Sequence, residues 1–299
     1  MRVTRLYDSK SPVLSMEFFP PRNEKAEAGF GTIVDELFEM DPDYMSVTFG
    51  AGGSNRDGSY QAVKTMMDKS IPTVAYLAGY GMAPEEIIEV LDRYRDMGIK
   101  TIFVIRGDQP QQEGFAPHPD SFSYASDLIA FIKKRYDFTL GCAGYPEGHQ
   151  EAESLEKDIE YLKAKVDNGA EYVVAQTFYD NRFYFDYVER CRFAGVTVPI
   201  IPGIMPVYSV KMARILAKVC GSTITPELEA LMTEVDPDDK QAVLSMGMDF
   251  ATDQCRGLLN GGAPGLHLYT MDRSSPTVEV VRRLRSENFF RETKVPTAR

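Results

Sequence analysis

The 299-residue sequence has only four cysteines and three histidines, and neither set forms a recognised binding pattern. The cysteines lie far apart without a C-x-x-C pair, so neither a zinc site nor a disulfide framework is indicated. The histidines are separated by 31 and 118 residues, which matches no metal-ligand spacing. We therefore expect no bound metal and a location in the reducing cytoplasm.

Positive charge and long apolar runs are also scarce. Lys and Arg total 33 against 44 Asp and Glu, which gives a formal net charge of −11. Because nucleic acids and anionic membranes are bound by clustered basic side chains, this balance excludes a general surface for either. The sequence has no run of about 18 apolar residues and no apolar signal-peptide core near its start. It predicts a protein that is neither secreted nor membrane-spanning and whose partner is a small molecule.

Short apolar runs rich in β-forming residues alternate with segments that carry helical signals. The clearest helix is residues 83–98, with Pro84 in the first turn and Gly98 as its stop. Residues 236–261 predict another, with Asp236 as cap, Pro237 in the first turn and Gly261 at its end. The strand-like runs span residues 13–19, 44–49, 73–77, 101–105, 138–143, 172–175, 197–201 and 265–269.

Eight such runs separated by helices predict an α/β fold, a (β/α)8 TIM barrel, better than an open sheet. The gap before the eighth run is longer than the others, and the segment TPELEALMTEV predicts an extra helix there. No linker or low-complexity segment is evident, so we expect residues 1–299 to form one (β/α)8 catalytic domain. A doubly wound sheet is the alternative.

Polar residues follow nearly every strand-like run, where a barrel enzyme carries its chemistry. They are Glu17, then Thr48 with GAGGS, then Arg106 to Asp108, then Tyr145 to Glu147, then Gln176, and finally His267 to Arg273. In the first run, alternation puts Glu17 on the face opposite Met16 and Phe18, which in a barrel is the lumen. Desolvation there suits a general acid.

Each of these signals also has a plainer interpretation. An isolated Glu in a strand is more often a structural or edge charge than a catalyst. The glycine-rich segment 49–59 does not match G-x-G-x-x-G, and His149 and His267 are more often packed or solvated. No G-x-S-x-G motif or paired Cys and His supports nucleophilic catalysis. The residues alone thus predict a barrel enzyme with two acids and an amide at its rim, and no substrate.

The motifs taken together resemble the methylenetetrahydrofolate reductase family, in its bacterial, catalytic-domain form. The matching segments occur in the family's order along essentially the whole chain. They are SMEFFPPR, VTFGAGGS, VIRGDQP, YASDLI, GYPEGHQEA, KVDNGAEYVVAQTFYD, IPGIMPV and HLYTMDR. The resemblance implies an FAD-containing (β/α)8 barrel that reduces 5,10-methylenetetrahydrofolate to 5-methyltetrahydrofolate with electrons from NADH or NADPH, by a ping-pong mechanism.

The resemblance also implies roles for individual residues. Glu17 would be the general acid that opens the folate's five-membered ring, and Asp108 would tune the flavin and stabilise the cationic iminium. Gln176 would hydrogen-bond the substrate, and Tyr269 and Arg273 would lie near the folate. The implied FAD contacts are Thr48, Arg106, Gly107, Asp108, Tyr124, Ala125, Tyr145, His149, Asp158 and Lys165.

Asp158 and Lys165 are seven residues apart, about two turns along one helix face, and would serve the ribose and pyrophosphate region of the cofactor. Without the motifs, we would interpret both residues as part of a solvated, charged helix face.

Two positions depart from the family pattern. Thr73 stands where some relatives have a flavin-contacting histidine, and Met212 stands where some have a glutamine that touches the folate.

The resemblance also bears on regulation and assembly. The chain ends before the regulatory domain of eukaryotic relatives, so we expect no inhibition by S-adenosylmethionine. We expect the protein to form a homo-oligomer.

Two other functions stay open. One is a folate-binding subunit without reductase activity, which would have no need to keep Glu17, Asp108 and Gln176 together. The other is a barrel transferase acting on a pterin, which would bind no flavin.

Overall fold

A parallel β-sheet forms the centre of the molecule. The computed structural model describes residues 1–49, 56–109 and 114–290. In these residues nine strand segments pair in the order β7-β6-β5-β4-β3-β2-β1-β9-β8, and every pairing is parallel. The segments are β1 (Val13–Phe18), β2 (Tyr44–Val47), β3 (Thr73–Ala78), β4 (Thr101–Ile105), β5 (Thr139–Gly144), β6 (Tyr172–Ala175), β7 (Ile200–Ile201), β8 (Gly203–Ile204) and β9 (Gly265–Tyr269).

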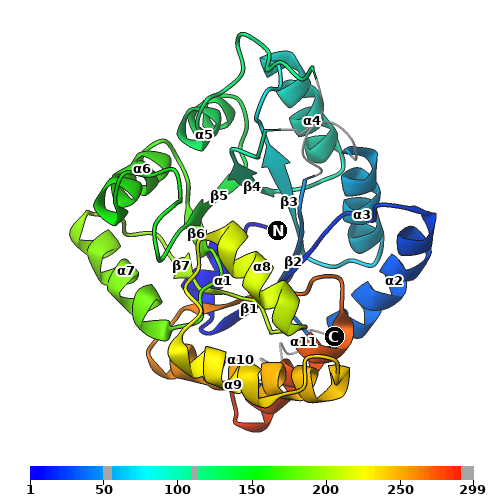
Figure 1. Cartoon of the computed structure of the whole chain (residues 1–299). Coiled ribbons are helices and arrows are strands. Elements are labelled where there is room, and N and C mark those ends of the chain that lie inside the picture. The colour runs from blue at the N-terminus through cyan, green and yellow to red at the C-terminus, as the bar shows by residue number, and fades with distance from the viewer. Residues whose placement is uncertain (50–55, 110–113, 291–299) are drawn as a thin grey trace.

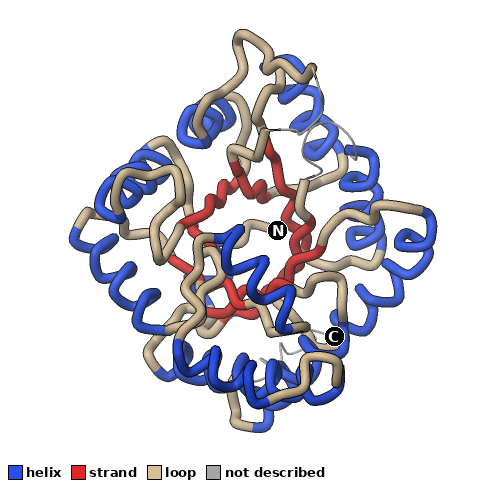
Figure 2. Tube along the Cα trace, in the orientation of Figure 1, coloured by secondary structure: helices blue, strands red, loops and turns tan. Residues whose placement is uncertain are grey.

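The two ends of this sheet belong to one interrupted strand. Only Pro202 separates β7 from β8, and β7 pairs with β6 while β8 pairs with β9. The sheet therefore closes into a ring of eight strands, visible in Figure 2, which confirms the (β/α)8 barrel and excludes the open doubly wound alternative. The expected bounds of the seventh strand, 197–201, were wrong, since pairing begins at Ile200 and resumes after Pro202.

Helices surround the ring of strands on all sides (Figure 1). They are α1 (Thr4–Ser9), α2 (Glu24–Phe38), α3 (Arg56–Asp68), α4 (Pro84–Asp96), α5 (Ala125–Lys133), α6 (Leu155–Asp167), α7 (Asn181–Phe193), α8 (Val210–Cys220), α9 (Pro226–Glu234), α10 (Lys240–Asn260) and α11 (Ser274–Ser286). No helix within the described ranges is long and apolar enough to span a membrane.

The helix signals in the sequence are confirmed in part. Helix α4 begins at Pro84 and ends shortly before Gly98, and α9 is the extra helix expected before the last strand. The predicted start of α10 at Asp236 was wrong. The cap is Asp239, whose carboxylate accepts from the first backbone N–H groups of the helix, while Asp236 accepts from Asp238 in the preceding turn.

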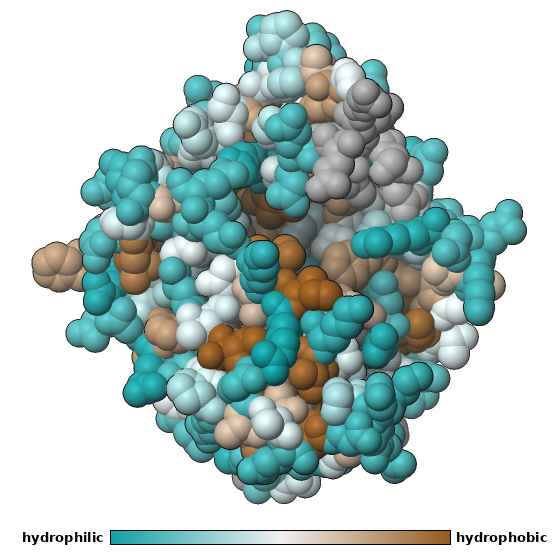
Figure 3. Space-filling model, in the orientation of Figure 1, coloured by the Kyte–Doolittle hydropathy of each residue, from teal (hydrophilic) through white to brown (hydrophobic). Residues whose placement is uncertain are grey.

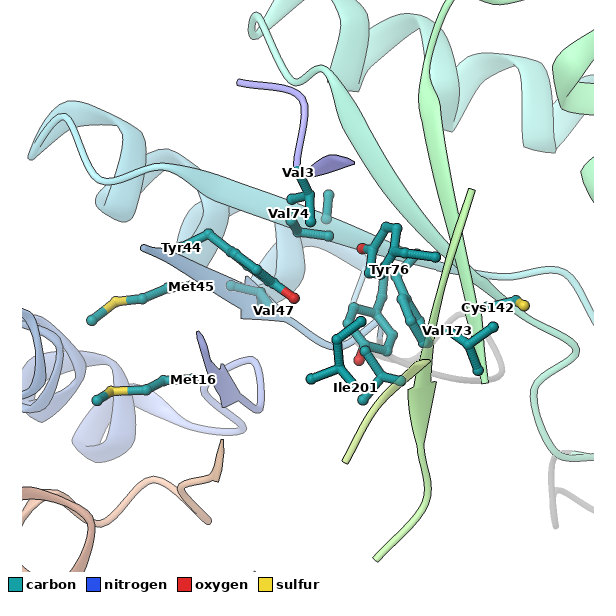
Figure 4. Packing of buried hydrophobic residues seen from close by; sticks show 14 of the residues in the cluster. Val3, Met16, Tyr44, Met45, Val47, Val74, Tyr76, Cys142, Val173 and Ile201 are labelled. Atoms are coloured by element: carbon teal, nitrogen blue, oxygen red, sulfur yellow. The ribbon is translucent and has the colours of Figure 1, made fainter. Parts of the chain in front are cut away.

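Side chains alternate between two environments along the strands, and Glu17 of β1 faces the lumen, as predicted, since it accepts a hydrogen bond from Tyr76 of β3. Met16 and Met45 point toward the surrounding helices, whereas Tyr44 and Tyr76 project into the barrel interior (Figure 4). The interior is closed at the N-terminal ends of the strands by the first residues of the chain. There the Val3 N–H donates to the hydroxyl of Thr101, the first residue of β4. At the opposite, C-terminal ends of the strands, helix α8 lies in front of part of the ring (Figure 1).

Candidate functional site

A pocket of about 860 Å³ opens where the strands end. Its walls come from β1, β3, β4, β5, β6 and β9, together with Leu216 and Cys220 of α8. Apolar surface gathers around the hollow on this face (Figure 3). Two other hollows, of about 610 and 980 Å³, lie among helices and include none of the predicted site residues. The strand-end pocket includes nine, namely Glu17, Thr48, Arg106, Gly107, Asp108, Tyr145, His149, Gln176 and Tyr269.

Glu17 lies at the floor of this pocket and is 9% exposed. Its Oε2 atom accepts a hydrogen bond from the hydroxyl of Tyr76 and lies 3.1 Å from Nε2 of His267. Tyr76 comes from β3, which is not a neighbour of β1 in the sheet, so this contact runs through the lumen. Burial of the carboxyl group is thus compensated by two polar partners.

His267 is a functional candidate that the sequence reasoning missed, because it was interpreted as a packed or solvated residue. It is 1% exposed, and both ring nitrogens have partners: Nε2 meets Glu17, and Nδ1 lies 2.8 Å from Oγ of Ser15. The signal that could have found it is the two-residue spacing to Tyr269 within one strand. That spacing places both side chains on the lumenal face with Glu17.

Tyr76 is the second candidate that was missed. Thr73, singled out in the sequence as the departure from a flavin-contacting position, begins β3 at the end remote from the pocket, and its hydroxyl donates to Ile71. The β3 side chain that lines the pocket is Tyr76. Its ring packs at 4.5 Å from that of Phe103, which fixes the direction of its hydroxyl.

The residues after β4 form one wall of the pocket. Arg106 donates to Glu151 at 2.5 Å, and this ion pair raises the pKa of the guanidinium further. Gly107 has φ +84°, and a Cβ atom there would lie 2.9 Å from Cβ of Ala78. The position therefore requires glycine on two grounds, conformation and space. Asp108 follows as an exposed residue of the pocket lining.

A group of polar residues lies beside the pocket at the ends of β5 and α6. Lys165 donates to the carbonyl of Ala143 at 2.6 Å, and its ammonium lies 5.7 Å from the centre of the Tyr145 ring. Asp158 is 5% exposed, and burial raises the pKa of its carboxyl group despite Lys165 and the backbone N–H of His149. Its Oδ2 atom has no hydrogen-bond partner in the described part of the chain.

Gln176 and Tyr269 complete the inner wall. The Gln176 side-chain oxygen accepts from the backbone N–H of Thr177 at 2.9 Å, which turns the amide NH2 group into the available donor. The Tyr269 hydroxyl donates to the carbonyl of Ala175 at 3.2 Å, and its ring meets His267 edge to face. Burial raises the pKa of Tyr269 well above its usual range, so this phenol stays neutral.

Five predicted site residues lie outside the pocket lining. Asp158 and Lys165 are adjacent to it, as described above. Tyr124 and Ala125 stand at the start of α5, where Tyr124 is 64% exposed. The Arg273 guanidinium lies 5.4 Å from the centre of the Tyr208 ring, at the start of α11.

Two further sequence observations concern the rim. Met212 is 39% exposed on α8, and the α8 side chains that face the pocket are instead Leu216 and Cys220. The glycines of GAGGS lie outside the described residues. Within those residues no group of three or more His, Cys, Asp or Glu side chains is arranged to hold a metal ion.

Comparison with known proteins identifies a family. The family model described as methylenetetrahydrofolate reductase matches residues 2–285. The 5,10-methylenetetrahydrofolate reductase of Escherichia coli is 34% identical over 87% of this chain and 86% of its own length. A protein of Arabidopsis thaliana named methylenetetrahydrofolate reductase (NADH) 1 is 32% identical over 95% of this chain and 50% of its own length.

A relative from Caenorhabditis elegans, named a probable methylenetetrahydrofolate reductase (NADPH), is 33% identical over 95% of this chain and 44% of its own length. The chain thus spans about half the length of its plant and animal relatives. Among solved structures, a Clostridium thermocellum protein described as binding two copies of 5-methyl-5,6,7,8-tetrahydrofolic acid superposes with a TM-score of 0.67. It is 16% identical over 96% of this chain and 99% of its own, a likeness that concerns the fold alone.

Proposed function

This chain belongs to the methylenetetrahydrofolate reductase family, and we propose that it reduces 5,10-methylenetetrahydrofolate to 5-methyltetrahydrofolate. The proposed cofactor is FAD and the electron donor NADH or NADPH, since relatives bear both names. The observation that carries the proposal is the placement of Glu17 on the floor of a pocket whose walls hold Asp108 and Gln176. An acid, a negative charge and a neutral amide are what this reaction needs in one place.

The residues beside the pocket fit a dinucleotide cofactor. The Asp158 carboxylate has a buried oxygen without a partner in the described chain, and a ribose hydroxyl is a suitable donor for it. Lys165 and Arg106 provide cationic groups suited to a pyrophosphate. Gly107 lets the backbone after β4 turn at φ +84° close against Ala78, and this turn carries Arg106 and Asp108 at the wall of the pocket.

The other proposed FAD contacts are Thr48, Asp108, Tyr124, Ala125, Tyr145 and His149. When bound, FAD would take a hydride from the nicotinamide in one half-reaction and supply it to the folate in the other. This is the proposed ping-pong mechanism, in which the two substrates use the pocket in turn.

Glu17 supplies the proton in the proposed mechanism. Transfer of its proton to a nitrogen of the folate's five-membered ring makes that nitrogen a better leaving group, and the ring opens to an iminium. The methylene carbon of this cation then accepts the hydride. Tyr76 and His267 stabilise the carboxylate that remains, since both contact its Oε2 atom.

The remaining side chains bind and orient the substrate. The Asp108 charge stabilises the cationic iminium and raises the hydride-donating power of the cofactor. Gln176 offers its NH2 group to the substrate, because its oxygen is already engaged by Thr177. Tyr269 and Arg273 are proposed to contact the folate from β9 and the start of α11.

The test begins with the colour of the purified protein. We expect a yellow protein that releases FAD on denaturation, bleaches anaerobically with NADH or NADPH and regains its colour with 5,10-methylenetetrahydrofolate, forming 5-methyltetrahydrofolate. A protein that stays colourless after incubation with FAD would support a pterin transferase instead. A flavoprotein that methylenetetrahydrofolate does not reoxidise would support a folate-binding subunit. The cytoplasmic location and the homo-oligomeric state stay predictions.

A further inference from the structure

We infer that Tyr76 is a positioning residue for Glu17: its hydroxyl, together with His267, engages Oε2 of the carboxyl group and thereby directs the acidic proton to Oε1. The inference rests on the proposed function, in which Glu17 donates that proton to the folate. It assigns a task to a side chain that the sequence motifs did not single out, and it specifies which carboxyl oxygen performs the chemistry.

The position of Tyr76 is fixed independently of Glu17. Its side chain is 5% exposed, and its ring packs against Phe103 with the centroids 4.5 Å apart. Burial raises the pKa of the Tyr76 hydroxyl well above its usual range. The phenol therefore keeps its proton at every working pH and acts as a permanent donor to Oε2 of Glu17.

His267, the second partner of Glu17, contacts the same carboxyl oxygen, Oε2. A carboxylate can only accept hydrogen bonds, so when Glu17 is ionised His267 must donate to it from Nε2. In the neutral ring Nδ1 is then an acceptor, 2.8 Å from Oγ of Ser15, whose one hydroxyl hydrogen also has the Leu266 carbonyl within reach at 3.2 Å. Two donors thus converge on Oε2, whereas no described residue donates to Oε1. A proton on Oε1 displaces neither donor, and Glu17 is one of the residues that line the pocket.

Four further titratable groups act on Glu17 from the elements packed around it. Tyr44 from β2, Tyr172 from β6 and Tyr269 from β9 are buried phenols, and burial raises the pKa of each. Asp272, in the loop after β9, is the further carboxyl group that acts on Glu17, and burial raises its pKa also. The three phenols are neutral wherever the enzyme is assayed.

The substitution Tyr76→Phe removes the hydroxyl and keeps the ring that packs on Phe103. Stopped-flow absorbance of the FAD-loaded variant should show reduction by the nicotinamide within about 2-fold of the parent. Reoxidation by methylenetetrahydrofolate should be at least about 10-fold slower, since the acid is less well oriented and its conjugate base has lost a donor. The fall in reoxidation at high pH should move upward by at least about half a pH unit, because a carboxylate with one donor fewer holds its proton more tightly.

The matched control is Tyr184→Phe. Tyr184 is also buried, at 2% exposed, and its hydroxyl donates to the carbonyl of Ile200 at 2.8 Å, but the residue lies outside the pocket lining. This variant should lose stability and leave both half-reactions and the pH profile unchanged. Adding Tyr76→Phe to Glu17→Gln should slow reoxidation by less than about 2-fold further, because a residue that acts through Glu17 has no effect without the acid.

The outcomes separate this inference from the proposed function. If the parent protein is not reoxidised by methylenetetrahydrofolate, the proposed function fails. If the parent is active and Tyr76→Phe reoxidises normally with an unshifted pH profile, the inference alone is overturned. Loss of bound FAD in Tyr76→Phe would also overturn it, since the hydroxyl would then serve the cofactor or the fold. Independent effects of the two substitutions would show that Tyr76 does not act through Glu17.

Discussion

Glu17 and His267 lie on adjacent strands of the barrel and meet through Oε2 and Nε2 at 3.1 Å, with their side chains 10% and 1% exposed. An unpaired buried carboxylate would cost several kcal/mol, a large part of the stability of a domain. The contact explains why the chain tolerates an acid inside its first strand. It also means that the acid is held in place from a strand 250 residues away.

The first prediction concerns Glu17→Gln, which keeps the size of the side chain and removes its acidic proton. Opening of the folate ring needs that proton, whereas hydride transfer from a nicotinamide has no comparable leaving group. We expect reoxidation of FAD by methylenetetrahydrofolate to slow roughly 100-fold, or about 3 kcal/mol. Reduction by NADH or NADPH should be nearly unchanged, and anaerobic stopped-flow absorbance measures both.

The matched control for this substitution is Glu39→Gln, on an exposed carboxyl group at the end of α2. It should leave both half-reactions at the parent rate. Equal losses in the two half-reactions of Glu17→Gln, with FAD still bound, would contradict the role of Glu17 as the acid specific to the folate.

The second prediction concerns Asp108→Asn at the pocket wall. Removing a negative charge near the cofactor should raise the midpoint potential of bound FAD by roughly 20–40 mV, equivalent to about 1–2 kcal/mol for two electrons. Because Asp108 is exposed, added salt should reduce the difference. Dye equilibration measures the potential. Asp8→Asn, on the exposed surface of α1, is the control, and a potential at or below that of the parent would exclude the electrostatic role.

The third prediction concerns Gly107→Ala. At φ +84° an alanine costs about 1–2 kcal/mol, and its Cβ would also press on Ala78 at 2.9 Å. Gly262→Ala is a matched control, because Gly262 has φ +87° and nothing within 4 Å of an added Cβ. Urea unfolding should show Gly107→Ala as the less stable of the two, and only Gly107→Ala should lose FAD. If the two variants are equally stable, the structure around Ala78 adjusts to the added methyl group without a loss of stability.

The local part of this site could be predicted from the sequence, and the contacts between distant residues could not. Alternation along β1 correctly placed Glu17 in the lumen, since a two-residue period is a property of any strand. The partners of Glu17 depend on the strand order and on closure of the barrel. Tyr76 and His267 lie 59 and 250 residues away along the chain, so no local pattern predicts these contacts. The break of the seventh strand at Pro202 likewise arises from ring closure, because β7 and β8 pair with different neighbours.

The start of α10 could not be predicted because the sequence offers two residues that can each cap the helix. Asp236 and Asp239 are both competent caps, and the sequence offered the first of them together with Pro237. The choice of Asp239 is made by the turn ahead of the helix, which uses Asp236 to bind the N–H of Asp238. The end of the helix at Gly261 was predicted correctly.

The last prediction concerns Asp158, whose burial raises its pKa above the ordinary value of 3.8 and whose Oδ2 atom has no partner in the described chain. The folded protein therefore keeps this proton to a higher pH than the unfolded chain, so raising the pH through that interval lowers the stability of the protein without cofactor. Asp158→Asn removes the titration. We expect the stability of the cofactor-free variant to rise relative to that of the parent as the pH is raised above the ordinary pKa of 3.8.

The same substitution should weaken the binding of FAD, because an uncharged amide oxygen is a weaker acceptor for a ribose hydroxyl than a carboxylate oxygen. Urea unfolding across the pH range and titration with FAD measure the two effects, and Asp8→Asn, which is exposed, should show neither. A variant that is no more stable than the parent at neutral pH would mean that Lys165 and the His149 N–H already compensate the charge. A gain in stability with undiminished FAD binding would place the cofactor elsewhere. Both effects together are expected of a carboxylate kept at a cost to the empty fold because the ligand needs it.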